Sequence, residues 1–118
     1  LLSGHYRRGQ EPPKGTPWSK TEGHGLSAHK YDFEEAMTER VDRIVQTLID
    51  IGQEHDKTPA QVAIAWILDR PEVTAPILGA DSLAHVDDAF GAADWRLMPE
   101  DRKALDEVSE QVGPRIYA

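Results

Sequence analysis

Residues 73–91 read VTAPILGADSLAHVDDAFG, and this stretch decides the fold. The run 73–78 is apolar and partly β-branched, which predicts a buried strand, although Pro76 argues against a fully hydrogen-bonded central strand. A Gly-Ala turn follows at Gly79, and Ser82 is placed to cap a helix. The expected apolar side of this helix consists of Leu83, Val86, Ala89 and Phe90. A strand, a short glycine turn and a capped helix together aim backbone N–H groups at an anion.

Ser82 has two interpretations. A hydroxyl at a helix start, with a glycine before it, is a weak signal of a phosphate site, and the spacing alone favours an ordinary N-cap that satisfies the unpaired amides of the first turn. Asp81 would repel a phosphate, but it suits ribose hydroxyls as a hydrogen-bond acceptor. His85 is positioned either to contact a bound ligand or to lie in solvent, and the spacing alone favours solvent. Asp87 and Asp88 are adjacent, so on a helix they do not face each other as a paired acid and base.

The length and composition of the chain exclude several kinds of partner and site. At 118 residues the chain is one domain or part of one, and its net charge of −8 argues against nucleic acid and against an anionic membrane surface as partners. The absence of cysteine excludes disulfides and thiolate sites. No apolar run approaches the roughly 20 residues that span a bilayer, and no signal peptide is recognisable. We therefore expect a cytoplasmic protein.

Helical periodicity dominates the rest of the chain. A long helix is predicted to begin at Asp32 as its N-cap and to run to Gly52, the first breaking signal, with a further turn possible. The sequence TPAQ at 58–61 is a capping box with proline at the first helical position, and it opens a helix that is apolar on most sides. A last helix is predicted to begin at 98–101 and to end at 113–114.

Two features indicate that more chain belongs beside this one. A single strand cannot satisfy its own backbone groups, and the sequence begins at Leu1 as though cut from something longer. Residues 3–30 lack apolar periodicity and predict a long polar loop of the kind found in lids or disordered segments. Trp18 either pins this loop to the protein or is exposed.

The sequence contains no complete catalytic constellation. Its five histidines lack the spacing of a zinc site, and neither a G-x-S-x-G nor a G-x-G-x-x-G motif is present. No tyrosine lies in a motif that would make it an acid. We therefore expect no catalytic and no metal-binding residues in this chain.

Three stretches resemble the C-terminal part of the aldo-keto reductases, which are NAD(P)-dependent (β/α)8-barrel oxidoreductases. They are LLSGHY at 1–6, TPAQVAIAWILDRPEVTAPILGA at 58–80, and ADSLAHVDDAFGAADWRLMPEDRKALDEVS at 80–109. The resemblance implies an α/β fold, the C-terminal portion of a TIM barrel with helix 7, strand 8, helix 8 and the final helix, predominantly helical in this segment. Residues 1–118 would be a partial domain, with a cofactor-covering loop over 1–31 and the helices, strand 8 and cofactor-binding turn over 32–118.

The resemblance also implies a site for NADP or NAD. The implied cofactor-binding residues are His5, Gly79, Asp81, Ser82, His85 and Asp88. Gly79, Ser82 and Asp88 conform to the family pattern. Asp81 and His85 replace groups that meet the adenosine 2′-phosphate, His5 stands where a lysine is frequent, and Ala89 replaces an asparagine that bonds the adenine. These four changes weaken the case for tight NADPH binding and make a preference for NADH a hypothesis.

The family's catalytic Asp, Tyr, Lys and His have no counterpart in this chain. The resemblance therefore implies the C-terminal part of a reductase that reduces carbonyl substrates by hydride transfer, contributing the adenosine-phosphate side of the cofactor site and inactive alone. Its partners would be a nicotinamide dinucleotide and the missing N-terminal part of the barrel, or a second copy. The alternatives are a non-catalytic nucleotide-sensing module and a helical self-association module.

Overall fold

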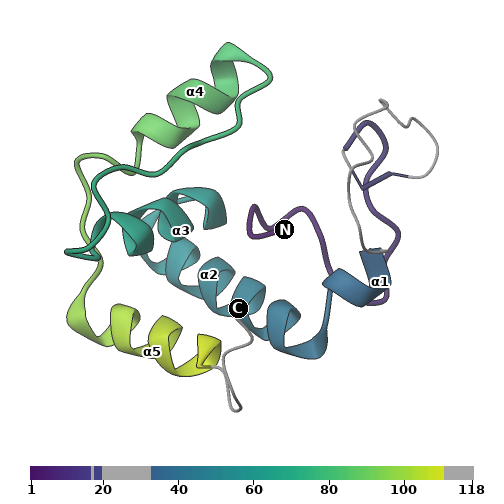
Figure 1. Ribbon diagram of the computed structural model, residues 1–118, viewed down its shortest axis with the longest axis horizontal. Helices are drawn as coiled ribbons and strands as arrows, with labels where there is room; N and C mark the ends of the chain where they lie inside the picture. The colour runs from purple at the N-terminus through teal and green to yellow at the C-terminus, as the bar shows by residue number, and fades with distance from the viewer. Residues whose placement is uncertain (17, 20–32, 111–118) are drawn as a thin grey trace.

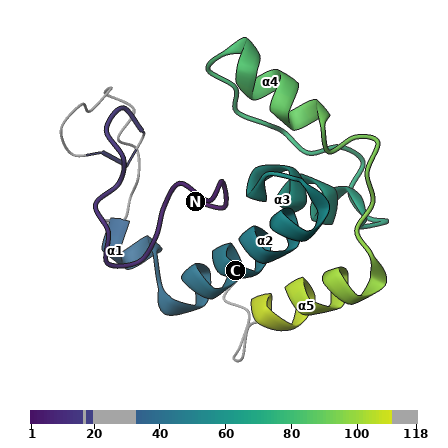
Figure 2. The same ribbon diagram turned by 180° about the vertical axis from the view of Figure 1, so that it is seen from behind.

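The computed structural model describes residues 1–16, 18–19 and 33–110, and this part of the protein is helical (Figure 1). Helix α2 packs against both α3 and α5, and α4 stands apart at the end of an extended segment, in contact with α3 (Figures 1 and 2). None of the helices in the described part is long and apolar enough to cross a membrane. The helices are α1 (Phe33–Ala36), α2 (Glu39–His55), α3 (Pro59–Leu68), α4 (Leu83–Phe90) and α5 (Pro99–Ser109).

The long helix predicted from Asp32 is divided in two. Thr38 is the N-cap of α2: its backbone is extended, and its hydroxyl accepts the Val41 N–H at 3.2 Å. Met37, just before the cap, is 1% exposed and packs in a small aromatic cluster, which holds the break in place. The prediction of one uninterrupted helix was therefore wrong, and the predicted cap at Asp32 lies outside the described residues.

The turn between α2 and α3 is tight. Helix α2 continues through Gly52 to His55 and ends at Asp56, which adopts the left-handed conformation (φ 54°). The Lys57 N–H then donates to the Gly52 carbonyl at 2.8 Å. Thr58 begins α3 with the predicted capping box, in which its hydroxyl accepts the Gln61 N–H and its own N–H donates to the Gln61 side chain, so this prediction is confirmed.

The main core lies between α2, α3 and α5. Helical spacing places one apolar stripe of α2 against small residues of α3, which allows the two helices to approach closely. The predicted burial of α3 is confirmed over only part of its surface, since Ile67 and Leu68 at its end are exposed. The buried members of this core are Ile44, Leu48, Ile51, Val62, Ala63, Ala65, Leu97 and Leu105.

The N-terminal segment is anchored on α1 and α2. Tyr6 is buried against Phe33, with ring centroids 5.9 Å apart, and Trp18 meets the edge of the same ring at 5.9 Å. Trp18 thus packs on the protein, as the first of its two interpretations requires. Burying these rings supplies the apolar contact that ties this segment down.

A partly buried ion pair between Arg7 and Asp42 also holds the N-terminal segment on α2. The Arg7 side chain donates to the Asp42 carboxylate through Nε (2.9 Å) and Nη2 (3.2 Å), and the Arg8 backbone N–H donates to the same group at 3.0 Å. The Arg7 hydrogen bonds, followed by the Arg8 N–H, hold the pKa of Asp42 below its usual value. The two-pronged geometry fixes the segment on the first turns of α2.

The predicted strand at 73–78 is not formed. These residues run extended, but no strand is present anywhere in the part of the chain that the structure describes. Ile77 is fully exposed and Leu78 is half exposed. A strand exists only when a neighbour accepts and donates its backbone hydrogen bonds, and residues 1–16, 18–19 and 33–110 supply no second strand for this segment.

Helix α5 is held by polar contacts as well as by the core. Arg102 donates to Asp69 at 2.7 Å, and the Trp66 indole N–H donates to Asp106 at 2.8 Å, where Arg70 also pairs. These contacts join the end of α3 to the middle of α5. The last helix ends at Ser109, because Glu110 already has a non-helical backbone (φ −57°, ψ 124°), so the prediction that it continues to residue 112 was wrong. The predicted stop at 113–114 lies outside the described residues.

Candidate functional site

The start of α4 is built as the sequence predicts. Ser82 has an extended backbone (φ −150°, ψ 162°), and its Oγ accepts the His85 N–H at 3.3 Å. The His85 ring turns back over the helix start, where its Nδ1 accepts the Asp81 N–H at 3.4 Å. A backbone N–H only donates, so Nδ1 is the acceptor in this contact. Three of the predicted site residues therefore meet at one helix end.

Backbone donors at this helix end are available to a ligand. The N–H groups of Leu83 and Ala84 have no acceptor among the described residues, as expected of the first positions in a helix. Both residues are exposed. At Gly79 an added Cβ would meet nothing within 4 Å, so the turn that precedes the helix is also open. Exposed N–H groups and the positive end of the helix dipole are suited to an anion.

Asp88 contacts the beginning of α3 and not the start of α4. The Thr58 hydroxyl donates to both oxygens of its carboxylate at 3.2 Å, and the Gln61 side-chain amide donates to its backbone carbonyl at 2.8 Å. Lys57 Nζ donates to the Gly91 carbonyl at 3.0 Å. These contacts join α4 to the beginning of α3, so in this structure Asp88 is half-buried and positions the helix.

His5 is exposed and lies away from the turn. Its backbone N–H donates to Ser3 Oγ at 3.5 Å, and no contact joins it to residues 79–88 within the described ranges. Figures 1 and 2 both show the N-terminus beside α2 and α3 and apart from the start of α4. Of the six residues predicted to bind a cofactor, the structure thus gathers Gly79, Asp81, Ser82 and His85.

The cavities of the protein lie elsewhere. One of about 880 Å³ is lined by the N-terminal segment, α1 and the start of α2, including Arg8, Phe33 and Asp42. Another, of about 690 Å³, borders the turn between α2 and α3. Neither of these two cavities is lined by residues of the α4 turn, where residues 79–85 are all exposed.

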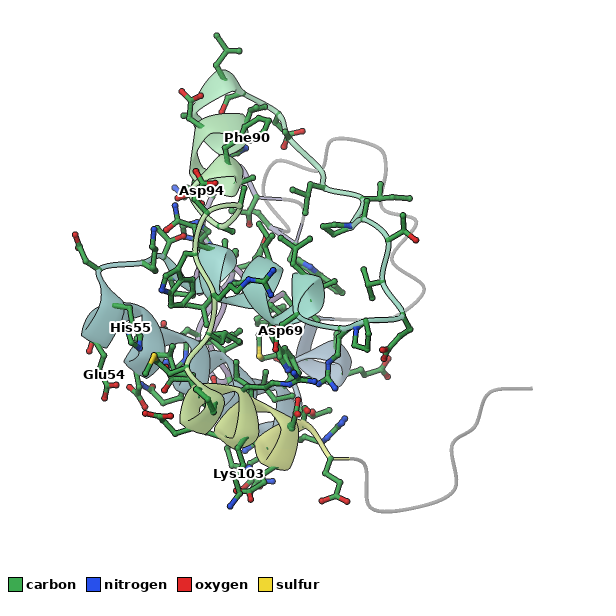
Figure 3. All side chains as sticks on the ribbon, turned by 90° about the vertical axis from the view of Figure 1, so that its left-hand side faces the viewer. Glu54, His55, Asp69, Phe90, Asp94 and Lys103 are labelled. Atoms are coloured by element: carbon green, nitrogen blue, oxygen red, sulfur yellow. The ribbon has the colours of Figure 1, made fainter. Side chains whose placement is uncertain are left out.

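The structure brings together a cluster of one histidine and two carboxylates, Glu54, His55 and Asp101, that the sequence did not predict. His55 Nε2 lies 2.7 Å from Asp101 Oδ2, and a Glu54 oxygen lies within 4.8 Å of both ligand atoms. Glu54 and His55 mark the end of α2 in Figure 3. His55 lies in the last turn of α2 and packs on Trp95, and Asp101 lies in the first turn of α5. The Asp101 carboxylate therefore complements the dipole of α5, and the pair joins the two helices.

The surface around α4 is unusually apolar. Leu83 is 83% and Phe90 is 70% exposed, and no residue of α4 is buried. Figure 3 shows Phe90 on α4, well away from α2 and α5. The predicted apolar side of this helix is therefore split, since Leu83 and Phe90 are exposed whereas Val86 and Ala89 are partly buried. Exposed large apolar side chains of this kind, with Ile77 and Leu78 on the preceding segment, are typical of interfaces.

Comparison with known proteins gives the family. The model of the aldo/keto reductase family matches residues 1–110. The chain belongs to this family. A probable aldo-keto reductase of Glycine max is 28% identical over 95 residues, which cover 78% of this chain and 27% of that protein. An aldo-keto reductase of Metarhizium robertsii is 28% identical over 108 residues, covering 92% of this chain and 27% of that protein.

A third relative is an uncharacterized oxidoreductase of Mycobacterium tuberculosis, 36% identical over 75 residues that cover 64% of this chain and 23% of that protein. The chain thus spans about a quarter of the length of the curated aldo-keto reductases it matches. The family implies a TIM barrel, whereas the described residues are helices alone, as fits a fragment of such a barrel.

Proposed function

We propose that this chain is the C-terminal part of an NAD(P)H-dependent aldo-keto reductase and supplies the adenosine-phosphate side of its cofactor site. The observation that carries the proposal is the Ser82-capped start of α4, with its exposed N–H groups. In TIM barrels a phosphate site is frequently formed by the loops after strands 7 and 8 and the N-terminus of a short extra helix. In this assignment residues 73–78 are strand 8, and α4 is the extra helix.

The donors at this turn fit a dinucleotide diphosphate. The N–H groups of Leu83 and Ala84 and the Ser82 hydroxyl offer hydrogen bonds to anionic oxygens, and Gly79 leaves room for a close backbone approach. When bound, the nicotinamide supplies the hydride that reduces a carbonyl carbon. The residues of this chain would hold and orient the adenosine end, and no catalytic role is assigned to them.

The remaining segments of the barrel would cover the apolar surface beside this site. Ile77 and Leu78 are exposed on a segment with unpaired backbone groups, and Phe90 is exposed on α4. In a closed barrel the segment 73–78 gains strand neighbours on both sides, and its apolar residues leave water. We therefore expect the isolated chain to reduce no carbonyl substrate, because the rest of the barrel carries the chemistry.

The test removes one N–H donor from the turn. In the full-length protein that carries residues 1–118, Leu83→Pro deletes the N–H at the first helical position, where proline is tolerated. The extended backbone of Ser82 is the conformation that a following proline requires. Leu83→Ala is the matched control, because it removes the same side chain and keeps the N–H.

The readout is the dissociation constant for NADH and NADPH, by fluorescence titration, with helicity checked by circular dichroism. Loss of a hydrogen bond to a charged group predicts about ten- to hundredfold weaker binding for Leu83→Pro than for Leu83→Ala. Equal affinities of the two variants, or no binding of either nucleotide to the wild type, would overturn the proposal. Carbonyl reduction by residues 1–118 alone would contradict the proposal that the catalytic residues lie in the rest of the barrel.

A second candidate is self-association of the chain, favoured by the exposure of Leu83 and Phe90. Sedimentation of the 118-residue chain tests it, with Phe90→Ser as the variant. A dimer that Phe90→Ser dissociates, in a chain that binds no nucleotide, would support this candidate. A monomeric chain would remove it.

A further inference from the structure

The capping box that begins α3 also holds α4. The Thr58 hydroxyl accepts the Gln61 N–H, and the same hydroxyl donates its proton to the Asp88 carboxylate at 3.2 Å. The Gln61 side chain is used in the same way, because its Oε1 accepts the Thr58 N–H at 3.0 Å and its Nε2 donates to the Asp88 carbonyl at 2.8 Å. Both side chains of the box therefore donate to a single residue of α4.

The charges at this junction complement the dipoles of both helices. The Asp88 carboxylate lies at the N-cap of α3, where a helix dipole favours a negative charge. Lys57 Nζ donates to the carbonyl of Gly91, the C-cap of α4, where the dipole favours a positive charge. Hydrogen bonds with one ionised partner are stronger than neutral ones. The α3–α4 junction thus consists of Lys57, Thr58, Gln61, Asp88 and Gly91.

Apolar packing contributes little to the attachment of α4. No residue of this helix is buried, and among the described helices it packs chiefly on α3. The approach at the junction is nevertheless close, since an added Cβ at Gly91 would lie 2.2 Å from Gln61 Nε2. The position of α4 on the described part of the chain therefore depends on the polar contacts of the junction.

We propose that Asp88 is a positioning residue for the nucleotide site, and that it acts by fixing α4 on α3. The inference rests on the proposed function, since it requires the dinucleotide at the start of α4. The family resemblance implies a direct contact between Asp88 and the cofactor, whereas its carboxylate is here engaged by the Thr58 hydroxyl. A nucleotide that binds only the docked form of α4 has an apparent affinity proportional to the fraction of docked molecules.

The experiment measures hydrogen exchange of the α4 amides, and the dissociation constants for NADH and NADPH, in the full-length protein that carries residues 1–118. The test variants are Asp88→Ala and Lys57→Met. Loss of a charge-assisted hydrogen bond should accelerate α4 exchange about tenfold in each and weaken the binding of both nucleotides by one common factor of about three- to tenfold. Lys57 contacts the end of α4 remote from Ser82, so it affects the nucleotide only through the helix.

Two control variants accompany the test. Asp87→Ala removes an exposed carboxylate from the neighbouring position of α4, so its exchange and affinities should equal those of the wild type. Lys57→Arg keeps the cationic donor and should retain the wild-type affinities.

Four results would overturn the inference while the proposed function stands. They are weaker binding in Asp88→Ala but not in Lys57→Met, which would indicate a direct contact with the nucleotide; a change in affinity for one nucleotide alone; equal effects of Asp87→Ala and Asp88→Ala; and Lys57→Arg as weak as Lys57→Met. Exchange tests the junction without any nucleotide, and unchanged α4 exchange in Asp88→Ala would also overturn the inference. A wild type that binds neither nucleotide would overturn the proposed function itself.

Discussion

Gly52 offers a sharp test of the packing between α2 and α3. It is an internal residue of α2, where replacement by alanine ordinarily stabilises a helix by about 0.5–1 kcal/mol. Here the opposite is expected. A Cβ at position 52 would lie 2.4 Å from the backbone oxygen of Lys57, about 1 Å short of an ordinary contact. The obstacle is backbone, so no side-chain rotation relieves it.

The expected cost follows from what must move. The turn is already constrained by the left-handed Asp56 and by the Lys57 N–H bond to the Gly52 carbonyl, at 2.8 Å. Overpacking of this kind costs about 1–3 kcal/mol, and the helix propensity of alanine offsets only part of it. A net loss of roughly 1–2 kcal/mol corresponds to a fall in Tm of roughly 3–8 °C for a domain of this size.

The assay is thermal and urea unfolding followed by circular dichroism at the helical band. Gln53→Ala is the matched control, because Gln53 is the exposed next residue of the same helix. Its Tm should equal or slightly exceed that of the wild type. A Gly52→Ala variant as stable as Gln53→Ala would refute the reasoning, since it would show that the turn accommodates a methyl group without strain.

Three further outcomes are expected. Leu48→Ala, at a site with no exposed surface, should lose about 2–5 kcal/mol in urea unfolding, and a loss comparable to an exposed substitution would contradict the assigned core. Because the pKa of Asp42 is lowered in the folded state, its stabilising contribution is complete above the ordinary value of about 3.9 and disappears as pH falls through the lowered value. Asp42→Asn should therefore flatten stability against pH in that acid range, and parallel wild-type and variant curves would refute this. Thr58→Ala, which removes the N-cap hydroxyl of α3, should lower the free energy of unfolding by about 1 kcal/mol, and Thr58→Ser should lose much less. Equal losses in the two variants would contradict the role of the hydroxyl as a cap.

Locally determined features were predictable from the sequence. The capping box at Thr58 and the cap at Ser82 each depend on a side chain and a backbone N–H three residues away, so a short window of sequence contains both partners. The contacts among Asp81, Ser82 and His85 likewise join residues only three or four positions apart. The local geometry at the start of α4 could therefore be predicted from the sequence, and the cofactor-binding role of these residues stays a prediction.

Features that depend on distant partners were not predictable in this way. The break at Thr38 accompanies the burial of Met37 beside Tyr6, which belongs to a remote segment. The strand at 73–78 failed for the complementary reason, because its pattern describes a segment with neighbours that the described chain does not provide. The hydrogen bond from the Thr58 hydroxyl to the Asp88 carboxylate likewise depends on how α4 packs against α3. The helical periodicity of the sequence does not predict that packing.

The route of the chain between α3 and α5 has an evolutionary consequence. The chain leaves the helical core after Asp69, passes through α4, and returns before Arg102, and these two residues pair at 2.7 Å across the mouth of the excursion. The entropy of closing such a loop grows only with the logarithm of its length, so doubling it costs about 0.6 kcal/mol. Insertions, deletions and substitutions at the exposed positions within 72–85 are thus expected to leave the supporting helices folded, whereas Ala92 and Leu97 further along belong to the buried part of the protein. The segment that carries the proposed cofactor-binding turn is therefore free to vary in sequence while the helices that support it stay folded.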